Sequence, residues 1–492
     1  MVKCIPDKNK ITKWLLLSLG IVVAFCVAIF IGKRNYIPSW VDWTEREVSF
    51  EHGKKGNEIL RLTVGGKKFS VSDECGEILF ETNIDIKVQD AIATDVDGDG
   101  LQDIIAVVWK RGLYGKHRPF WVTSDEKNYS QHVFIYGVSE DGEVSQKWFA
   151  SETGILINRI KLMDKKPQIV MFEDIDGDCT LWQWESFGLK NIENKVKIVA
   201  FGDNLIHDAI IDAANKEHGR NYDFLYEPFL DDIRSADIAA LNAETVLVDK
   251  ESMVSGYPSF GSPVAVGEAI ADAGFDIAVC ANNHVLDKGI DALEYTRRFY
   301  EAKGIKCLGI QDRADTEKRP YEVIKRNGIS FALFAYTYGT NAGDISDRYP
   351  NAVHYLPRNE EQEKELLEDL QKAREEVDII IVFVHWGEEY ELNASNEQMK
   401  MAALFAKGGA DAIIGSHPHV MQEVEELDRP DGGKTVVYYS LGNFRADQGK
   451  DENTKTGGEA ILTASHTFDG AGIVSFEIKK IDSYWMADNN SK

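Results

Sequence analysis

Polar side chains that can bind metal ions follow five apolar, strand-like segments in the C-terminal part of the chain. They are acids, amides and imidazoles, and each stands within a few residues of the end of its segment. They are, in chain order, Asp203, His207, Asn242, Glu244, Asn283, His284, His385, Glu389, His417 and His419. Because ligands bind at the carboxyl ends of the strands in open α/β sheets, we expect these groups to converge.

This set of residues suits one or two divalent metal ions of the manganese, zinc or iron type. Neutral imidazole binds such ions, and carboxylate and amide oxygens add further ligands. His417 and His419 flank Pro418, and in an extended segment their side chains point to the same side. Bound metal would activate water and stabilise charge on an attacked phosphoryl or acyl group. A single histidine at a strand end is more often structural, so the prediction depends on all five segments together.

A second candidate site is the aspartate-rich loop of the N-terminal half. Asp95, Asp97, Asp99 and Asp103 stand at loop positions 1, 3, 5 and 9, with Gly100 at the turn. Ligands that are all oxygen favour calcium. The loop resembles the calcium loops of FG-GAP/VCBS-type β-propeller blades, and a degenerate copy follows at 173–178. The alternative is an Asp/Gly turn without a metal ion.

Length and charge limit the classes of protein to consider. The chain has 492 residues, 43% of them hydrophobic, and a formal net charge of −26. This length predicts more than one domain. Such an acidic chain repels phosphate backbones, so we expect no nucleic acid among its partners.

An apolar segment near the N-terminus predicts a membrane anchor. The nineteen residues from Trp14 to Gly32 carry no charge, and lysines precede them. This length just crosses the hydrocarbon core, and the basic flank favours a cytoplasmic N-terminus. We therefore expect a single-pass protein of the cell membrane with most of the chain outside the cytoplasm. A cleaved signal peptide is the rival interpretation, but no small-x-small cleavage site follows.

The rest of the chain predicts two different folds. We expect a cytoplasmic tip and anchor over 1–34, a linker over 35–50, a β-propeller-blade-like module over 51–192, an α/β domain over 195–485 and a tail over 486–492. Short apolar runs broken by Gly, Asp and Asn indicate the all-β module, which is long enough for two or three blades. Alternating strand and helix patterns indicate the α/β domain, with helices expected at 263–273, 288–303, 359–376 and 396–407. An Asn327-Gly328 pair predicts a β-hairpin.

The C-terminal motifs also have a recognisable order. GD, N-x-E, ANNH, HWG, GSHPHV and YSLGNF occur in that sequence between about 195 and 485. This order resembles the CapA/PgsA family, which is linked to synthesis of the poly-γ-glutamate capsule. The resemblance implies a calcineurin-like metallophosphatase fold, a β-sandwich flanked by helices.

The resemblance also implies roles for individual residues. It makes His284 the catalytic acid, and it makes metal ligands of Asp203, Glu244, Asn283, His385, His417 and His419. The first motif departs from ordinary metallophosphatases, which carry Asp-x-His where this chain has Asp203 followed by Asn204 and Leu205.

Several further residues are candidates for supporting the site or for binding substrate. They are His207, Asn242, Asp287, Trp386, Glu389, Tyr390 and Asn443. Each has a structural alternative. Trp386 and Tyr390 can cover the core, Asp287 can start a helix, and Asn443 can belong to a tight turn.

Three functions follow as hypotheses. The first is a CapA-type protein that binds or processes poly-γ-glutamate or another anionic surface polymer at a metal-dependent site, together with other capsule-synthesis membrane proteins. The second is an extracytoplasmic metal-dependent phosphoesterase. The third is a non-catalytic surface assembly or adhesion protein.

Overall fold

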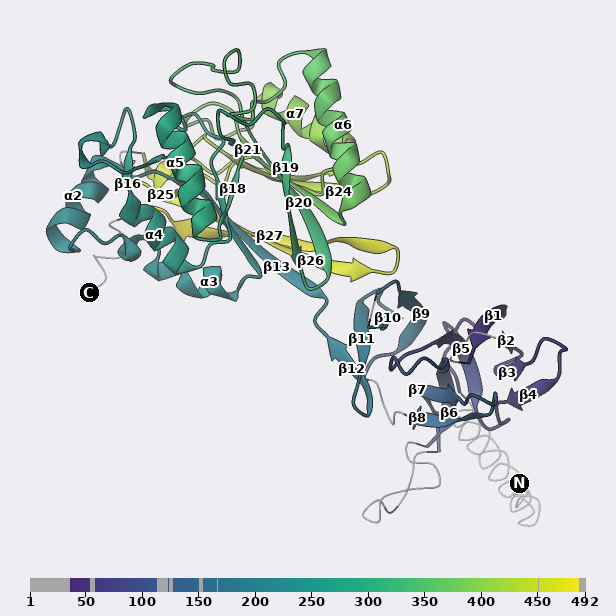
Figure 1. Ribbon diagram of the computed structural model, residues 1–492. Coiled ribbons are helices and arrows are strands. Elements are labelled where there is room, and N and C mark those ends of the chain that lie inside the picture. The colour runs from purple at the N-terminus through teal and green to yellow at the C-terminus, as the bar shows by residue number, and fades with distance from the viewer. Residues whose placement is uncertain are drawn as a thin grey trace, which may run out of the picture. The chain divides into compact units, whose positions relative to one another are not determined.

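The computed structural model describes residues 36–53, 58–112, 123, 127–149, 154–165, 167–449 and 451–485 (Figure 1). The predicted anchor at 14–32 and the predicted tail at 486–492 lie outside these residues. In the part of the chain that is described, no helix is long and apolar enough to cross a membrane. The chain forms two compact units that divide between Glu193 and Asn194.

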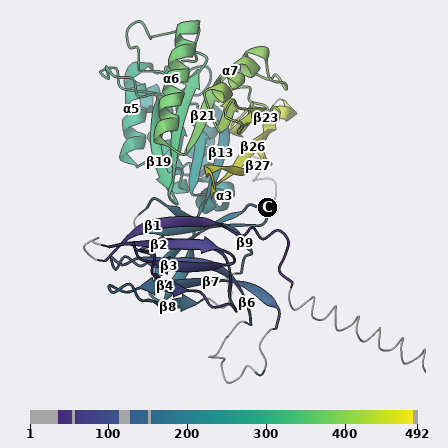
Figure 2. The same cartoon turned by 90° about the vertical axis from the view of Figure 1, so that its right-hand side faces the viewer.

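The N-terminal unit consists of three four-stranded antiparallel sheets in its described residues. In each sheet, strands that follow one another along the chain lie side by side, as Figure 2 shows for β1 to β4. The strands are β1 (Arg46–His52), β2 (Glu58–Gly65), β3 (Lys68–Ser72) and β4 (Ile78–Glu81); β5 (Lys87–Thr94), β6 (Asp103–Arg111), β7 (Tyr129–Val138) and β8 (Val144–Phe149); and β9 (Ile157–Met163), β10 (Ile169–Asp174), β11 (Cys179–Glu185) and β12 (Gly188–Ile192).

The middle sheet of this unit is buried on both faces. On β6, Ile104 and Ala106 belong to a core shared with the first sheet, whereas Ile105 and Val107 belong to a core shared with the third. Successive side chains of a strand point to opposite faces, so an unbroken apolar run can serve two cores. Four-stranded meanders are the unit of propeller blades. The predicted relation to FG-GAP/VCBS blades stays a prediction.

The C-terminal unit contains two larger mixed sheets. The first has the order β18 (Lys306–Leu308), β17 (Ile277–Val279), β14 (Ile238–Asn242), β13 (Lys195–Asn204), β26 (Thr456–Thr467) and β27 (Gly470–Asp482), and β25 (Asn443–Arg445) also pairs with β13. The second has the order β19 (Tyr321–Arg326), β20 (Ile329–Thr337), β21 (Ile379–His385), β22 (Ala412–Ser416), β24 (Lys434–Tyr438) and β23 (Val424–Asp428). A two-stranded sheet joins β15 (Leu247–Val248) to β16 (Ser262–Pro263).

The two sheets pack face to face over an apolar core, and the helices cover their outer faces. The inner core includes Ile198 from the first sheet and Phe331 from the second. The first sheet is covered by α2 (Asp208–Glu217), α3 (Leu230–Ser235), α4 (Val264–Ala273) and α5 (Gly289–Ala302), and the second by α6 (Glu360–Glu376) and α7 (Asn396–Lys407). The predicted two-sheet sandwich flanked by helices is therefore what the structure shows.

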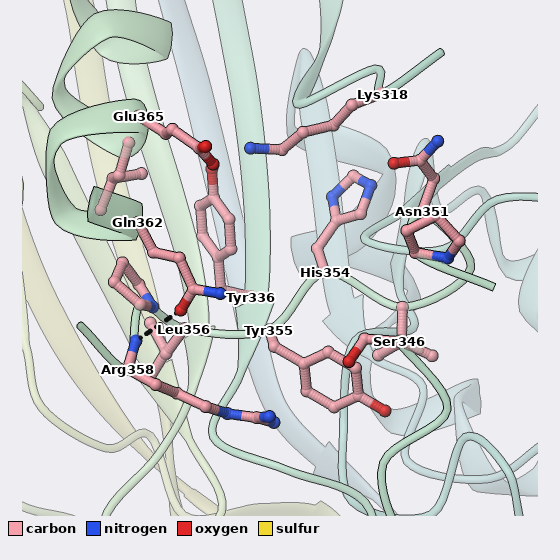
Figure 3. A pocket seen from close by; sticks show the side chains of 14 residues that line it. Lys318, Tyr336, Ser346, Asn351, His354, Tyr355, Leu356, Arg358, Gln362 and Glu365 are labelled. Carbon is pink, nitrogen blue, oxygen red and sulfur yellow. Dashed lines mark hydrogen bonds between the residues drawn. The ribbon is translucent and has the colours of Figure 1, made fainter. Parts of the chain in front are cut away.

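Local sequence signals explain where these elements begin and turn. The Asn359 side chain caps α6, and Ser395 forms a capping box with Gln398 at α7. Four single-turn helices complete the unit: η1 (Asp223–Leu225), η2 (Glu227–Phe229), η3 (Glu251–Met253) and η4 (Glu452–Lys455). The predicted hairpin is confirmed, because β19 turns into β20 at Asn327 and Gly328, which have φ angles of +47° and +81°. The first turn of α6 and the end of β20 also line a pocket (Figure 3).

The last residues of β13 lie against the turn before β25. A Cβ atom at Gly202 would lie 1.8 Å from the carbonyl oxygen of Gly442. The next amide, Asp203 N–H, donates to that same oxygen at 2.9 Å. Only glycine allows this close approach, which fixes the position of Asp203.

We predict that Gly202→Ala lowers the free energy of unfolding by about 1–3 kcal/mol, because the new methyl group forces the two segments apart. Denaturant unfolding of the full chain measures this change. Gly339→Ala is the matched control, since no heavy atom lies within 4 Å of its Cβ position. Equal stability of the two variants would contradict the prediction.

Candidate metal centre

Five strand ends from both sheets bring one set of polar side chains together. β13, β14 and β17 belong to the first sheet, and β21 and β22 belong to the second. Their ends supply Asp203, Asn242, Glu244, Asn283, His385, His417 and His419, each at most 4% exposed. The sandwich therefore places carboxylates, amides and imidazoles in one buried cluster.

Asp203 is the buried anion of this cluster. Its carboxylate accepts hydrogen bonds from Asn242 Nδ2 at 2.8 Å, His419 Nδ1 at 2.9 Å and the His417 amide at 3.2 Å. Burial disfavours ionisation, but the hydrogen bond and charge of His419, with Asn242 and His417, outweigh it and hold the pKa of Asp203 below its ordinary value. The group is therefore ionised at neutral pH.

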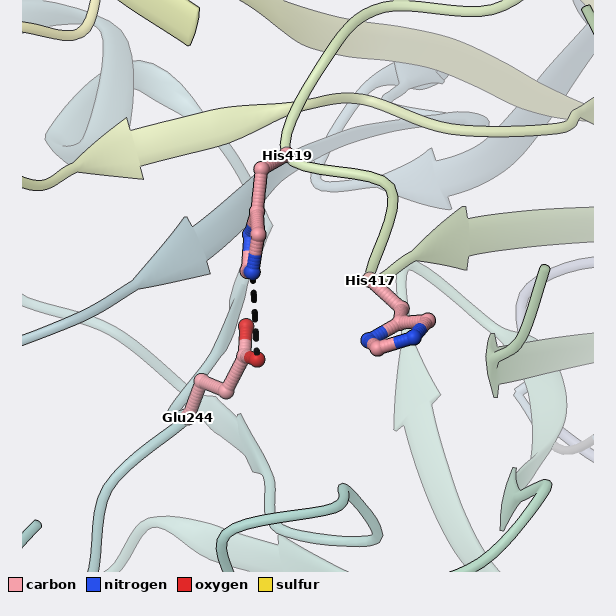
Figure 4. A group of neighbouring side chains, drawn as sticks. All are labelled: Glu244, His417 and His419. Carbon is pink, nitrogen blue, oxygen red and sulfur yellow. Dashed lines mark ion pairs between the residues drawn. The ribbon is translucent and has the colours of Figure 1, made fainter. Parts of the chain in front are cut away.

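Glu244 has a carboxylate oxygen with no hydrogen-bond partner among the described residues. Its Oε2 accepts from Asn242 Nδ2 at 3.2 Å, whereas its Oε1 is buried without a hydrogen bond. Oε1 lies 3.5 Å from His385 Nε2 and 4.0 Å from His419 Nε2, and Figure 4 shows the carboxylate facing the His419 ring. Burial, with the charge of Asp203, raises the pKa of Glu244 well above its ordinary value. A cation beside Oε1 would relieve this cost.

Two of the histidines, His385 and His417, are held in the neutral form. Burial, helped by the neighbouring imidazoles, lowers the pKa of His385 well below its ordinary value, and it lowers the pKa of His417 to about 3. His417 Nδ1 is buried without a hydrogen bond. A neutral imidazole keeps a lone pair for a metal ion.

The cluster therefore fits a divalent metal. Ligand atoms of Glu244, His417 and His419 lie within 4.8 Å of one another, and so do those of Asp203, Glu244 and His385. Glu244 belongs to both groups, so its carboxylate is placed to serve two neighbouring ions. Asn283 completes the set, with its Oδ1 at 2.9 Å from His385 Nε2. Mixed nitrogen and oxygen ligands agree with manganese, zinc or iron.

Backbone conformation also marks the site. His417 and His419 have φ angles of +102° and +61°, and Tyr390 has +68°. Residues other than glycine rarely adopt this region, and those that do cluster at functional sites. The strained backbone keeps both imidazoles in the candidate ligand cluster.

His284 is paired with a carboxylate beside this cluster. Its Nδ1 lies 2.7 Å from Asp287 Oδ2, and that oxygen also accepts from the Phe260 amide at 2.7 Å. From these partners we assign the Nδ1 proton to the hydrogen bond with Asp287, which leaves Nε2 for proton exchange. The Phe260 ring packs edge-on against the imidazole at 4.7 Å. Asp287 thus orients the His284 ring, and its role as a supporting residue of the site stays a prediction.

The other candidate residues divide into two groups. Tyr390 lies at the mouth of the cluster, half exposed, with its ring 6.0 Å from His419, and Glu389 beside it is exposed. Trp386 is instead 2% exposed and donates to the Tyr439 carbonyl, as its structural alternative expects, and its role beside a substrate stays a prediction. Asn443 pairs with Asp203 along the strands, but its amide turns away to Gln448 and Thr454.

His207 also stays outside the metal set. Its Nδ1 accepts from the Asp447 amide at 3.1 Å, and its ring packs against Phe260. Burial lowers its pKa to about 4. It supports the loop next to His284 and binds no group of the cluster.

Sequence reasoning missed Tyr338. Its amide donates to the His385 carbonyl at 2.9 Å, and its half-exposed ring lies 4.7 Å from the His417 ring. Burial raises its pKa to about 12, so its hydroxyl stays protonated. Tyr338 directly follows β20, so the strand-end rule that found the histidines would also have found it.

The aspartate loop of the N-terminal unit differs from its prediction. Asp95, Asp97 and Asp99 bring oxygens within 4.8 Å of one another, but Asp103 does not join them. The Lys147 ammonium instead lies 2.8 Å from Asp103 and 2.6 Å from Asp97. Burial still raises the pKa of Asp103 to about 6. The Lys147 ammonium from β8 thus occupies the position expected for a calcium ion among these carboxylates. The predicted site with four aspartate ligands is corrected, because Asp103 pairs with this lysine.

Backbone amides satisfy most of the remaining acids. Asp95 accepts from the amides of Gly98 and Gly100. In the degenerate copy, Asp174 accepts from those of Asp176 and Asp178, as in a turn without metal. Calcium at the first three aspartates stays a prediction.

Comparison with known proteins places the C-terminal unit in a family. The family model described as bacterial capsule synthesis protein PGA_cap matches residues 197–448, just over half of the chain. The chain belongs to this family. The matched segment contains every strand end that supplies the cluster.

Curated relatives carry related names. The chain is 29% identical over 215 residues to the PGA biosynthesis protein CapA of Bacillus subtilis, covering 44% of this chain and 53% of that protein. It is 28% identical over 273 residues to the capsule biosynthesis protein CapA of Bacillus anthracis, covering 53% and 62%. The matches thus span between half and two thirds of these relatives.

Similarity to solved structures is weaker. A phosphatase from Mycoplasma pneumoniae matches with a TM-score of 0.36 and 14% identity, over 59% of this chain and 95% of that one. A calcineurin-like phosphoesterase from Bacillus subtilis matches with a TM-score of 0.34 and 14% identity, over 60% and 92%. Because both scores are below 0.5, the sandwich is established by the chain's own sheets and helices.

We predict that Lys147→Met makes the N-terminal unit depend on calcium. Without the ammonium, buried Asp103 is unpaired, which costs about 3 kcal/mol. Thermal unfolding in EDTA should show this loss, and millimolar calcium should restore the stability. Lys190→Met, which removes an exposed ion pair with Glu185, is the control. Equal calcium stabilisation of the unaltered protein would contradict the prediction.

We predict opposite effects of Glu244→Gln on stability and on metal content. The amide keeps the shape but carries no charge, so metal-free protein should gain about 1–3 kcal/mol of stability. Metal content should fall sharply. Thermal unfolding in EDTA and elemental analysis measure the two effects.

The matched control is Glu459→Gln, another fully buried carboxyl, which pairs with Lys479 away from the cluster. This variant should keep its metal. A Glu244→Gln protein with normal metal content would exclude Glu244 as a ligand.

Proposed function

We propose that this chain is a membrane-anchored, extracytoplasmic capsule-synthesis protein that cleaves or transfers a bond of poly-γ-glutamate, or of a related anionic surface polymer, at a metal centre. Family membership and the CapA relatives support the polymer. One structural observation carries the metal: the buried Glu244 Oε1 has no hydrogen bond among the described residues and lies 3.5 Å from His385 Nε2. Other membrane proteins of capsule synthesis are the proposed partners.

The residues of the site would have different roles in the proposed reaction. Asp203, Glu244, Asn283, His385, His417 and His419 would hold one or two divalent ions. When bound, such ions supply activated water and stabilise negative charge on the attacked group. His284, with Nδ1 held by Asp287, would give a proton to the leaving group from Nε2. Tyr338 and Tyr390 would position the substrate at the mouth.

Metal also addresses an electrostatic difficulty. The chain has a net charge of −26 and does not attract a polyanion by its overall field. Divalent ions at the cluster would provide local positive charge. Metal-dependent binding of an anionic polymer is therefore the expected behaviour.

A second candidate is a metal-dependent phosphoesterase. The His284–Asp287 pair beside a buried ligand cluster favours it, because phosphoester hydrolysis needs the same metal ions and the same proton donor. The two candidates differ in substrate and share the site.

The test combines metal analysis with turnover of two substrates by the full-length protein. We expect bound metal, and we expect His417→Ala with His419→Ala to remove it. His284→Ala should keep the metal and lower kcat roughly 10²- to 10⁴-fold. His218→Ala is the control, since this half-buried histidine at the C-terminal end of α2 lies outside the cluster.

The outcomes separate the functions. Turnover of poly-γ-glutamate, with loss of capsule in a strain that carries the double variant, supports the first. Turnover of a simple phosphodiester alone supports the second. If the protein binds metal but turns over neither substrate, the third function, a non-catalytic assembly protein, is supported. If the double variant keeps its metal content unchanged, both catalytic functions are overturned.

A further inference from the structure

The pocket lined by β20 and α6 lies outside the candidate metal centre. It has a volume of about 260 Å³ and is enclosed by Tyr336 of β20, the segment from Ser346 to Arg358 and the first turns of α6 (Figure 3). None of the residues of the candidate metal centre lines it. Its chemistry can therefore be considered separately.

Tyr336 provides this pocket with an unpartnered polar group. The side chain is 3% exposed, and its hydroxyl has no hydrogen bond among the described residues. Its ring packs between Phe334 and Phe405. Burial raises its pKa above the ordinary value, so the hydroxyl stays protonated and can donate. Natural proteins rarely bury such a group without a partner.

Cationic side chains outnumber acidic ones among the residues that line the pocket. Lys318 and Arg358 line it, and Glu365 is the one acidic residue among those that do. Burial lowers the pKa of His354 in its wall to about 4, and the charges of Lys318 and Arg319 add to this effect. The site therefore favours an anion.

Lys318 and Arg358 each carry more N–H donors than their present ion pairs use. Lys318 pairs with Asp369 at 2.8 Å and Arg358 pairs with Asp344, and neither acid lines the pocket. An ammonium has three donors and a guanidinium has five. Each can therefore bind a ligand as well as its present partner.

We propose that this pocket binds a small carboxylate-bearing molecule, with hydrogen bonds from the Tyr336 hydroxyl and charge pairing from Lys318 and Arg358. The Ser346 and Tyr355 hydroxyls in its wall can bind further polar atoms of such a ligand. This site goes beyond the proposed function and does not depend on it.

The test compares succinate with succinamide, which has the same carbon chain and no charge. Titration calorimetry or ligand-observed NMR on the full-length protein at constant ionic strength should show at least tenfold tighter binding of succinate. Tyr336→Phe should weaken succinate binding at least fivefold without lowering the thermal midpoint, because its hydroxyl has no partner to lose. Lys318→Gln, an exposed position, should weaken it as well.

Two controls keep the result specific. Tyr321→Phe removes a hydroxyl that pairs with Glu376 outside the pocket, and it should leave binding unchanged. The double variant His417→Ala with His419→Ala should also bind succinate normally, which excludes binding to metal and separates this test from that of the proposed function.

Three results would overturn the proposal. They are equal affinity for succinate and succinamide, unchanged succinate affinity in Tyr336→Phe, and loss of succinate binding in the double histidine variant.

Discussion

A carboxylate that is fully removed from water can stay ionised only if donors surround it, and this constraint organises the C-terminal unit. Asp203 is 0% exposed and receives hydrogen bonds from Asn242, His419 and the His417 amide. These donors come from β14 in one sheet and from the segment after β22 in the other. Both sheets must therefore end at the same edge, and the close contact of Gly202 with Gly442 holds that edge in place. The ligand cluster is a consequence of this arrangement.

Much of this edge could be predicted because it depends on short-range patterns. An apolar run followed by a polar residue marks a strand end, and this rule found Asp203, Glu244, His385, His417 and His419. The helical patterns at 359–376 and 396–407 similarly placed two helices within a residue of their observed starts, Glu360 and Asn396. These features are encoded by neighbours in the chain.

Where the structure shows contacts that the sequence did not predict, the physical cause is that long-range partners compete for the same groups. Asp103 looked like a calcium ligand, but Lys147 reaches it from 44 residues away. Trp386 follows a metal-ligand candidate, yet its indole finds the Tyr439 carbonyl in the core. Nothing in the local sequence reveals such partners. Tyr338 is different, because it directly follows β20 and the strand-end pattern is local to the chain.

The left-handed backbone at His417 and His419 has a consequence for divergent members of the family. Each such residue costs about 1–3 kcal/mol, and glycine at the same position would avoid that cost. If the proposed metal ion holds these residues in place, a relative that no longer binds it would gain stability from glycine or asparagine at both positions. Loss of the Ser-His-Pro-His segment in a relative that keeps the sandwich would then mark a scaffold without the proposed metal site.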